Sequence, residues 1–147
     1  MNPFKLPPFW FLLATVGQFG IAWYSKVPAY SGVRIVLGYI MIGIGVVLVL
    51  ATWRAFRKWE TPICPFNEPN HMITDGPFLI SRNPLYLGEV VMLVGLAFLH
   101  GVWQAFVPVP LFILVIEWIF IRHEEATLRA KYGAEFKAYA LKVRKWI

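Results

Sequence analysis

The sequence has few charged residues and only one cysteine. Charged residues make up 15% of its 147 positions, whereas hydrophobic residues make up 59% and the mean hydropathy is +0.60. Because a soluble domain of this length could not hide so much apolar surface in its core, the composition predicts a single membrane domain, residues 1–147. The lone Cys64 excludes an internal disulfide and a cysteine metal cluster.

Motifs of several enzyme classes are also missing. The sequence contains no Gly-x-Ser-x-Gly, no His-Glu-x-x-His and no P-loop, so hydrolysis and nucleotide-phosphate chemistry have no support. His71 and His123 are too far from any Cys or Asp partner to indicate a metal site. The net charge of +6 includes no basic run interleaved with aromatic residues, so membrane lipid, and not nucleic acid, is the expected partner.

Four hydrophobic segments predict an all-α integral membrane protein with about four transmembrane helices. They run from about Pro8 to Tyr24, Val33 to Trp53, Leu85 to Leu99 and Phe106 to Ile121. The last two are short and close together, which indicates a helical hairpin. The glycines that would let helix backbones approach closely in lipid are Gly17, Gly20, Gly38, Gly43 and Gly45.

The basic residues predict the orientation. If the N-terminus lies inside, only Lys26 and Arg34 lie outside, and the rest of the 14 lysines and arginines face inward. This arrangement follows the rule that positive charge stays on the cytoplasmic side. We therefore expect a multi-pass protein of a bacterial inner membrane, with both termini and the 60–84 loop cytoplasmic.

Two non-spanning pieces would share that inner face. The loop from Glu60 to Pro84 contains five prolines, and loops of this length in compact proteins are usually functional or disordered. The tail from Arg122 onward carries apolar residues three and four positions apart, which predicts an amphipathic C-terminal helix with a break or bend at Gly133. These apolar residues are Leu128, Tyr132, Phe136, Tyr139, Val143 and Trp146. Residues 1–59 would thus hold two spans, and residues 60–147 the loop, the hairpin and the C-terminal helix.

The loop and the tail bring together side chains that suit a small-molecule pocket. They are Met72, Ile73, Phe78, Arg82, Asn83, Tyr86, Glu124 and Glu125. This set combines hydrogen-bond donors, carboxylate acceptors and apolar walls. Such a pocket fits a polar, zwitterionic ligand with an aromatic ring, at a boundary that a lipid-soluble molecule could reach sideways.

Two coupled motifs resemble one enzyme family. "ITDGPFLISRNPLYLG", residues 73–88, followed by "EEATLRAKYGAEFKAYALKVRKW", residues 124–146, is similar to the isoprenylcysteine carboxyl methyltransferase family and its bacterial relatives, which are akin to phospholipid N-methyltransferases. The resemblance covers residues 70–147 closely, and the first two segments match only in hydrophobicity. It implies an S-adenosylmethionine-dependent methyltransferase whose cofactor lies in a cytosol-facing pocket under the loop and the tail.

The resemblance also implies roles for individual residues. Its cofactor contacts fall on Asn70, His71, Met72, Ile73, Gly76, Phe78, Asn83, Pro84, Leu85, Tyr86 and Glu124. The catalytic candidates are Arg82, Glu124 and Arg122. A deprotonated carboxylate acceptor would need no general base, whereas an amine or hydroxyl acceptor would, and Glu124 or His123 could serve.

One departure from the family pattern leaves the acceptor open. Members that methylate prenylcysteine place an arginine four residues before the first Glu of the pair, and this sequence has Phe120 there, with Arg122 the nearest substitute. We therefore expect a lipophilic or amphiphilic small acceptor. It would reach the site from the bilayer near Glu89, Leu93, Glu117 and Phe120.

Two alternatives stay open. A reductase-like or non-catalytic relative of the same fold, with a nicotinamide cofactor in the reductase case, is disfavoured by the short first half of the chain. A small four-helix multidrug-type transporter depends on an acidic residue in its first span, and the first hydrophobic segment has none.

Overall fold

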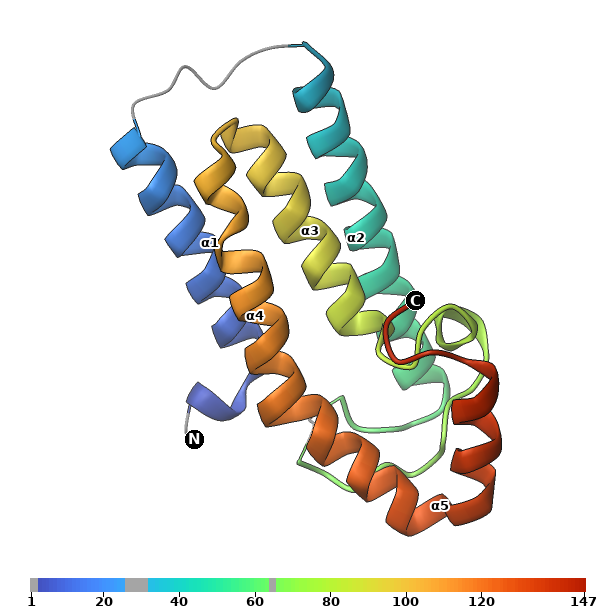
Figure 1. Ribbon diagram of the computed structural model, residues 1–147. Coiled ribbons are helices and arrows are strands. Elements are labelled where there is room, and N and C mark those ends of the chain that lie inside the picture. Colours follow the sequence, from blue (N-terminus) through green and yellow to red (C-terminus); the bar gives the residue numbers. More distant parts are fainter. Residues whose placement is uncertain (1–2, 26–31, 64–65) are drawn as a thin grey trace.

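The computed structural model describes residues 3–25, 32–63 and 66–147, and every regular element in these ranges is helical (Figure 1). The elements are η1 (Pro3–Lys5), α1 (Pro7–Ser25), α2 (Gly32–Lys58), η2 (Gly76–Leu79), α3 (Pro84–His100), η3 (Trp103–Phe106), α4 (Pro108–Ile116), η4 (Glu117–Ile121) and α5 (Arg122–Lys142). The all-α class predicted from the sequence is confirmed. Cys64 lies outside the described residues.

Two helices in the described part of the chain are long and apolar enough to cross a membrane. They are Gly32–Lys58 and the continuous helix Trp103–Lys142, which joins η3, α4, η4 and α5. The second has 40 residues, so at about 1.5 Å per residue it is roughly twice as long as the hydrocarbon layer is thick. Its apolar run ends at Ile121 and charged residues follow from Arg122, which places α5 outside the spanning part. The count of four spans stays a prediction.

Glycines bring α2 and α3 into close contact along their length (Figure 1). A Cβ atom added to Gly45 would lie 2.5 Å from the carbonyl oxygen of Gly88, and one added to Gly95 would lie 2.7 Å from that of Gly38. Side chains at these positions would force the helices apart. The prediction that Gly38 and Gly45 allow helix backbones to approach closely is therefore confirmed. Among the other predicted glycines, those whose added Cβ meets no atom within 4 Å are Gly20 and Gly43.

The main core lies between α3 and the α4–η4 helix, with α1 packed against it. Its buried residues are Tyr86, Leu93, Val109, Phe112, Ile116, Phe120 and Ile121. Gln18 of α1 is fully buried, and its amide nitrogen donates to the carbonyl oxygens of Leu93 at 2.8 Å and Ala105 at 2.9 Å. These two bonds satisfy the buried amide nitrogen of Gln18 and tie α1 to α3 and η3.

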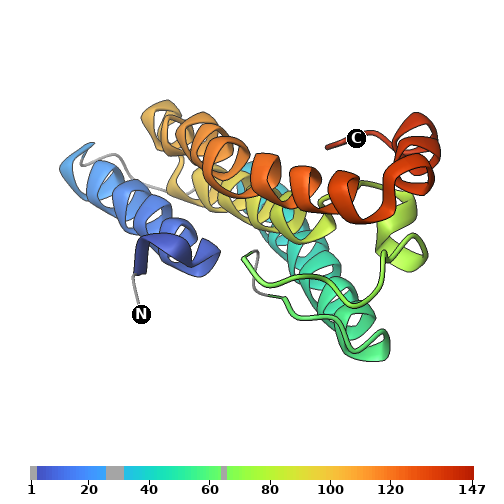
Figure 2. The same cartoon turned by 90° about the horizontal axis from the view of Figure 1, so that it is seen from below.

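One end of the helices, which we call the loop end, carries the described loop residues, 59–63 and 66–83, together with α5 (Figures 1 and 2). The helix α4 continues through the π-helical turn η4 into α5 without a break. At Gly133 the backbone leaves helical geometry, with φ 47° and ψ −111°, and the second half of α5 turns back toward α2 and α3. The tail helix and its bend were therefore predicted correctly, although the tail is a direct extension of the preceding helix.

Candidate functional site

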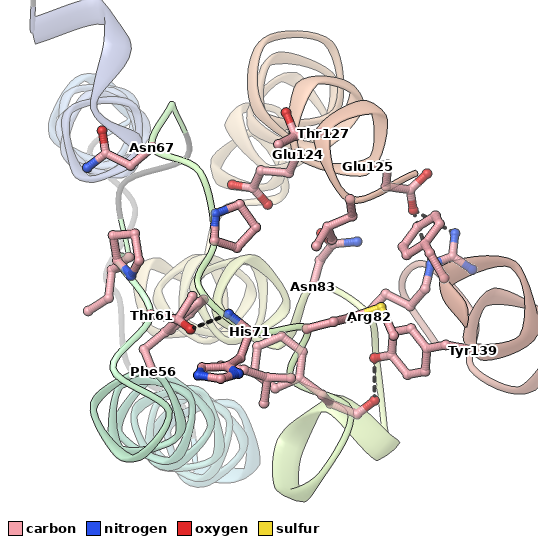
Figure 3. A pocket seen from close by; sticks show the side chains of 18 residues that line it. Phe56, Thr61, Asn67, His71, Arg82, Asn83, Glu124, Glu125, Thr127 and Tyr139 are labelled. Carbon is pink, nitrogen blue, oxygen red and sulfur yellow. Dashed lines mark hydrogen bonds and ion pairs between the residues drawn. The ribbon is translucent and has the colours of Figure 1, made fainter. Parts of the chain in front are cut away.

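Two adjoining cavities lie at the loop end. The larger, here called the loop cavity, is enclosed by the end of α2, the loop and α5; Glu124 and Thr127 lie on one side of it, and Phe56 and His71 on the other (Figure 3). The smaller, here called the helix cavity, reaches Thr52 of α2 and also takes in the first turn of α3. The residues that line both cavities are Phe56, Ile63, Phe78, Arg82, Asn83 and Glu124.

Most of the predicted cofactor residues line one of these cavities. The loop cavity is lined by His71, Met72, Ile73, Phe78, Asn83 and Glu124, and the helix cavity adds Pro84, Leu85 and Tyr86. Asn70 and Gly76 line neither of them. The Asn70 amide donates to the carbonyl oxygen of Glu60, and Gly76 begins η2 with a φ of 59°, a conformation that favours glycine. These two residues shape the loop.

The three catalytic candidates are not placed together. Arg82 and Glu124 line both cavities. Arg122 is exposed and lines neither, because its guanidinium carbon lies 3.7 Å from the centroid of the Trp118 ring, one turn earlier on the same helix. The catalytic role predicted for Arg122 therefore gains no support from this arrangement.

Sequence reasoning missed the part of α5 that lines the loop cavity. This wall is formed by Thr127, Leu128, Phe136 and Tyr139. Three of the four belong to the apolar stripe predicted for the tail helix, so that stripe was the signal that could have identified them. Thr127 had no comparable signal, since a threonine near the start of a helix is common on any surface.

Arg82 fastens the loop to the end of α5. Its Nη2 and Nε donate to Oε1 of Glu125 at 2.6 and 3.1 Å, and its Nη1 donates to the carbonyl oxygens of Val143 and Ala140 at 2.9 and 3.2 Å. The Arg82 and Glu125 side chains are only 14% and 13% exposed. The guanidinium thus satisfies carbonyls at the end of α5 that have no partner within the helix, and its charge is already balanced by Glu125.

The segment that follows α5 also binds the end of the loop, next to Arg82. The carbonyl oxygen of Lys145 accepts hydrogen bonds from the Ser81 hydroxyl at 3.0 Å and from the Asn83 amide at 2.9 Å. The Lys145 ammonium lies 2.7 Å from Oε1 of Glu117 and 3.8 Å from Oε2 of Glu125. Lys145 therefore fixes Asn83 where the two cavities meet, and it balances the charges of two acids.

Glu124 is the acid at the site that pairs with no lysine or arginine within the described residues. Its Oε1 accepts a hydrogen bond of 2.5 Å from the Tyr86 hydroxyl. Burial raises the pKa of Glu124 to about 7, although the Tyr86 bond acts in the opposite direction. Desolvation favours the neutral form of a carboxyl group. Near neutral pH, Glu124 can therefore gain or lose a proton.

The loop is held in place by both helices that flank it. At the end of α2, Lys58 donates to Asp75 at 2.9 Å. From α5, the Tyr139 hydroxyl donates to the carbonyl oxygen of Phe78 at 2.7 Å. Burial raises the pKa of Tyr139 to about 12, so this hydroxyl keeps its proton and stays a donor at neutral pH. These bonds hold the described part of the loop between α2 and α5, and its function stays a prediction.

The predicted access route beside the last two segments is wrong as stated. Leu93 and Phe120 have no exposed surface and belong to the main core, so they cannot line an opening to the bilayer. Glu89 is also buried, with 7% of its surface exposed. The helix cavity instead reaches α2 at Thr52 and the first turn of α3 at Leu85.

Comparisons with known proteins support the resemblance of the two motifs. A family model described as phospholipid methyltransferase matches residues 33–135. A relative from Haemophilus influenzae, named only as an uncharacterized protein, is 36% identical over 63 residues, which are 43% of this chain and the whole of that protein. No solved structure matches the chain. The family model covers the first motif and residues 124–135 of the second, and the resemblance predicted from the two motifs is confirmed.

Proposed function

The chain belongs to the phospholipid methyltransferase family, and we propose that it is an S-adenosylmethionine-dependent integral membrane methyltransferase whose acceptor is an amphiphilic amine. The observation that carries the proposal is the pair of adjoining cavities with Glu124 on the wall of both. One cavity lies under the loop and α5, where a polar cofactor would arrive from the cytoplasm. The other reaches the spanning helices, where a lipid-soluble acceptor would arrive.

The donor set of the loop cavity suits the cofactor. Phe56, Ile73, Phe78 and Leu128 offer apolar and aromatic walls for an adenine ring, and Asn83 offers a polar group beside them. The carboxylate of Glu124 would attract a positively charged sulfonium or ammonium group. When bound, S-adenosylmethionine supplies an electrophilic methyl group. The residues of this chain would orient that group toward the acceptor and exclude water.

The charges around the cavities favour an amine over a carboxylate as the acceptor. The cation best placed to bind a carboxylate, Arg82, is engaged by Glu125 and by two backbone carbonyls. Phe120 occupies the position where prenylcysteine-methylating members carry arginine, and it is fully buried. An anionic head group would be repelled by ionised Glu124, whereas an ammonium would be attracted. Glu124 can then accept the proton that an amine must lose before its nitrogen is nucleophilic.

A methyl-transfer assay tests this proposal directly. Labelled S-adenosylmethionine would be supplied with amine, thiol and carboxylate acceptors, each in a series of increasing chain length. We expect transfer to the amines, with kcat/KM climbing with chain length because each buried methylene contributes about 0.8 kcal/mol. A flat dependence on chain length would remove the bilayer route. Transfer to carboxylates alone would overturn the amine assignment but would not contradict the proposed cofactor site.

A further inference from the structure

The end of α5 and the residues after it carry exposed basic and apolar side chains that the proposed reaction does not use. Residues 137–147 include four lysines and arginines and no acid. Lys142 and Arg144 are exposed, and neither forms an ion pair with an acid in residues 3–25, 32–63 or 66–147. They are flanked by Leu141 and Ile147, which are 82% and 73% exposed. We call these four side chains the tail surface.

Contacts fix the tail surface at the level where the last spanning helix ends. The Lys145 ammonium lies 2.7 Å from Oε1 of Glu117, about one turn before the apolar run ends, and Trp146 packs against the main core. Trp118, the next residue after Glu117, is 63% exposed, as is typical of tryptophan where lipid meets water. The second half of α5 runs from its bend back toward α3 (Figure 1). The end of this helix, and not its bend, therefore lies beside the spanning helices.

The loop contributes further apolar side chains next to the tail surface. The backbone N–H of Arg82 donates to the carbonyl oxygen of Arg144 at 3.0 Å, so the end of the loop and the segment after α5 run side by side. Just before this bond in the chain, Leu79 and Ile80 are both exposed. Two segments far apart in sequence thus bring exposed apolar residues to the same level of the molecule, close to unpaired basic groups.

We propose that the tail surface binds anionic phospholipid of the membrane surface at the loop end, with Leu141 and Ile147 inserted between lipids and Lys142 and Arg144 on their phosphates. Charge complementarity supports this partner, because an anionic bilayer attracts each lysine or arginine near its surface. Apolar side chains beside such charges are stabilised by burial among the headgroups. Lipid fits better than an acidic protein, because the surface lies where the span leaves the hydrocarbon. The inference depends on this span crossing a bilayer and is independent of methyl transfer.

Single cysteines with a fluorescent bimane label test the contact with lipid. Leu141→Cys and Ile147→Cys would be made in the full chain with Cys64→Ser. Ala134→Cys is the matched control, since it is exposed and lies two turns earlier on the same face of α5, next to the bend. The proteins would be placed in nanodiscs of mixed phosphatidylglycerol and phosphatidylcholine, one of which carries a nitroxide quencher at the top of its acyl chain. The labels at positions 141 and 147 should be quenched, and the label at position 134 should not.

The same discs measure the preference for anionic lipid. The readout is quenching by labelled phosphatidylglycerol relative to labelled phosphatidylcholine at equal mole fractions. With the native basic residues, we expect a preference of about fivefold or more for phosphatidylglycerol at position 141. Lys142→Gln combined with Arg144→Gln should bring this ratio to within about twofold of one. Arg129→Gln, which removes an exposed arginine before the bend, should leave the ratio unchanged.

The possible results separate the contact from the charge preference. Labels at positions 141 and 147 that are not quenched, or that are quenched no more than the label at position 134, would overturn the insertion of the tail surface. A ratio near one with the native basic residues, or a preference that survives the double substitution, would overturn the binding of anionic lipid by Lys142 and Arg144. Quenching at positions 141 and 147, with a preference that the double substitution removes, is the result that the proposal requires.

Discussion

The hydroxyl of Tyr86, in the first turn of α3, donates a hydrogen bond of 2.5 Å to the carboxylate of Glu124, in the first turn of α5. Residues 38 positions apart in sequence thus meet where the loop cavity joins the helix cavity. The bond holds the acid at the junction that a methyl group would have to cross between cofactor and acceptor. A carboxyl group with a pKa of about 7 at this point can take up a proton under physiological conditions.

The first prediction concerns the pH dependence of catalysis. If Glu124 is the base, kcat/KM for an amine acceptor should rise as the pH passes through about 7, because the carboxylate is the active form. Tyr86→Phe removes a hydrogen bond that lowers this pKa, so the midpoint should move to higher pH. Glu124→Gln should abolish the inflection and lower the rate by about 10²–10⁴-fold. An inflection that persists unchanged in Glu124→Gln would assign it to another group.

The raised pKa of Glu124 also predicts how the stability of the protein depends on pH. The folded-state pKa of Glu124 lies above its ordinary value of 4.5, so between pH 4.5 and about 7 the folded state binds more protons than the unfolded state. The free energy of unfolding should therefore fall as the pH rises through this window. Thermal unfolding of the wild type and Glu124→Gln in detergent measures the contribution, and the variant should lose less stability over this range. A larger loss in the variant would contradict the sign.

The Arg82–Glu125 ion pair should matter far more for stability than the exposed pair Lys58–Asp75. Arg82→Met leaves Glu125 without its partner in a mostly buried position and removes bonds to two carbonyls, so it should cost about 3 kcal/mol. Lys58→Met, where the side chains are 66% and 46% exposed, should cost less than about 1 kcal/mol. Thermal unfolding of both variants in the same detergent makes the comparison, and equal shifts in unfolding temperature would contradict the larger contribution of the Arg82–Glu125 pair.

Helix packing gives a prediction within one element. Gly45→Val puts atoms where Gly88 already lies, so α2 and α3 must separate, and we expect a loss of about 1–3 kcal/mol or more. Gly43→Val, half a turn away on the same helix, adds a Cβ atom that has no neighbour within 4 Å, and its stability should stay close to wild type. The unfolding temperatures of the two variants test this difference in stability. Similar losses would mean that the effect lies in the glycine backbone and not in the contact.

The orientation can be tested with single cysteines in a Cys64→Ser background. Trp103→Cys lies in the turn between α3 and α4, at a residue that is 74% exposed, and it should react with an impermeant thiol reagent added outside. Lys137→Cys, on the exposed side of α5 at the loop end, should react only after the membrane is opened. This expectation follows from the excess of basic residues predicted to lie inside. The reverse labelling pattern would place the proposed cofactor site on the outer side of the membrane and contradict the predicted orientation.

Hydrophobic runs and helix-ending residues made most of the fold predictable. The segment predicted at Leu85–Leu99 is α3, Pro84–His100, which begins with a proline and is capped by Gly101 with a φ of 71°. Phe120 shows why the rest was harder. The sequence predicts that it lies beside the route of the acceptor from the bilayer, but it has no exposed surface. In a membrane protein, a residue that faces lipid and one that faces the core have the same apolar character, so hydrophobicity alone does not separate them.

The part of the candidate site that is formed by two short runs of sequence was predictable. The run from Arg82 to Tyr86 and the acid pair that begins with Glu124 stand out in the sequence, and both line the cavities. The pairing of Arg82 with Glu125, and not with Glu124, depends on the path of the chain after Gly133. Because that path is set by tertiary contacts, spacing in the sequence gave no sign of which acid would be left for a ligand.

Binding of S-adenosylhomocysteine to the purified protein, measured by calorimetry, tests the central claim most directly. The wild type should bind it saturably, and a nicotinamide dinucleotide should give no binding heat. Glu124→Ala and Tyr86→Phe should each weaken binding by about 1–3 kcal/mol without lowering the folded fraction, and Lys137→Ala, outside both cavities, should bind like the wild type. Wild-type affinity in the folded Glu124→Ala and Tyr86→Phe variants, or binding of the dinucleotide in place of S-adenosylhomocysteine, would contradict the assignment of this site.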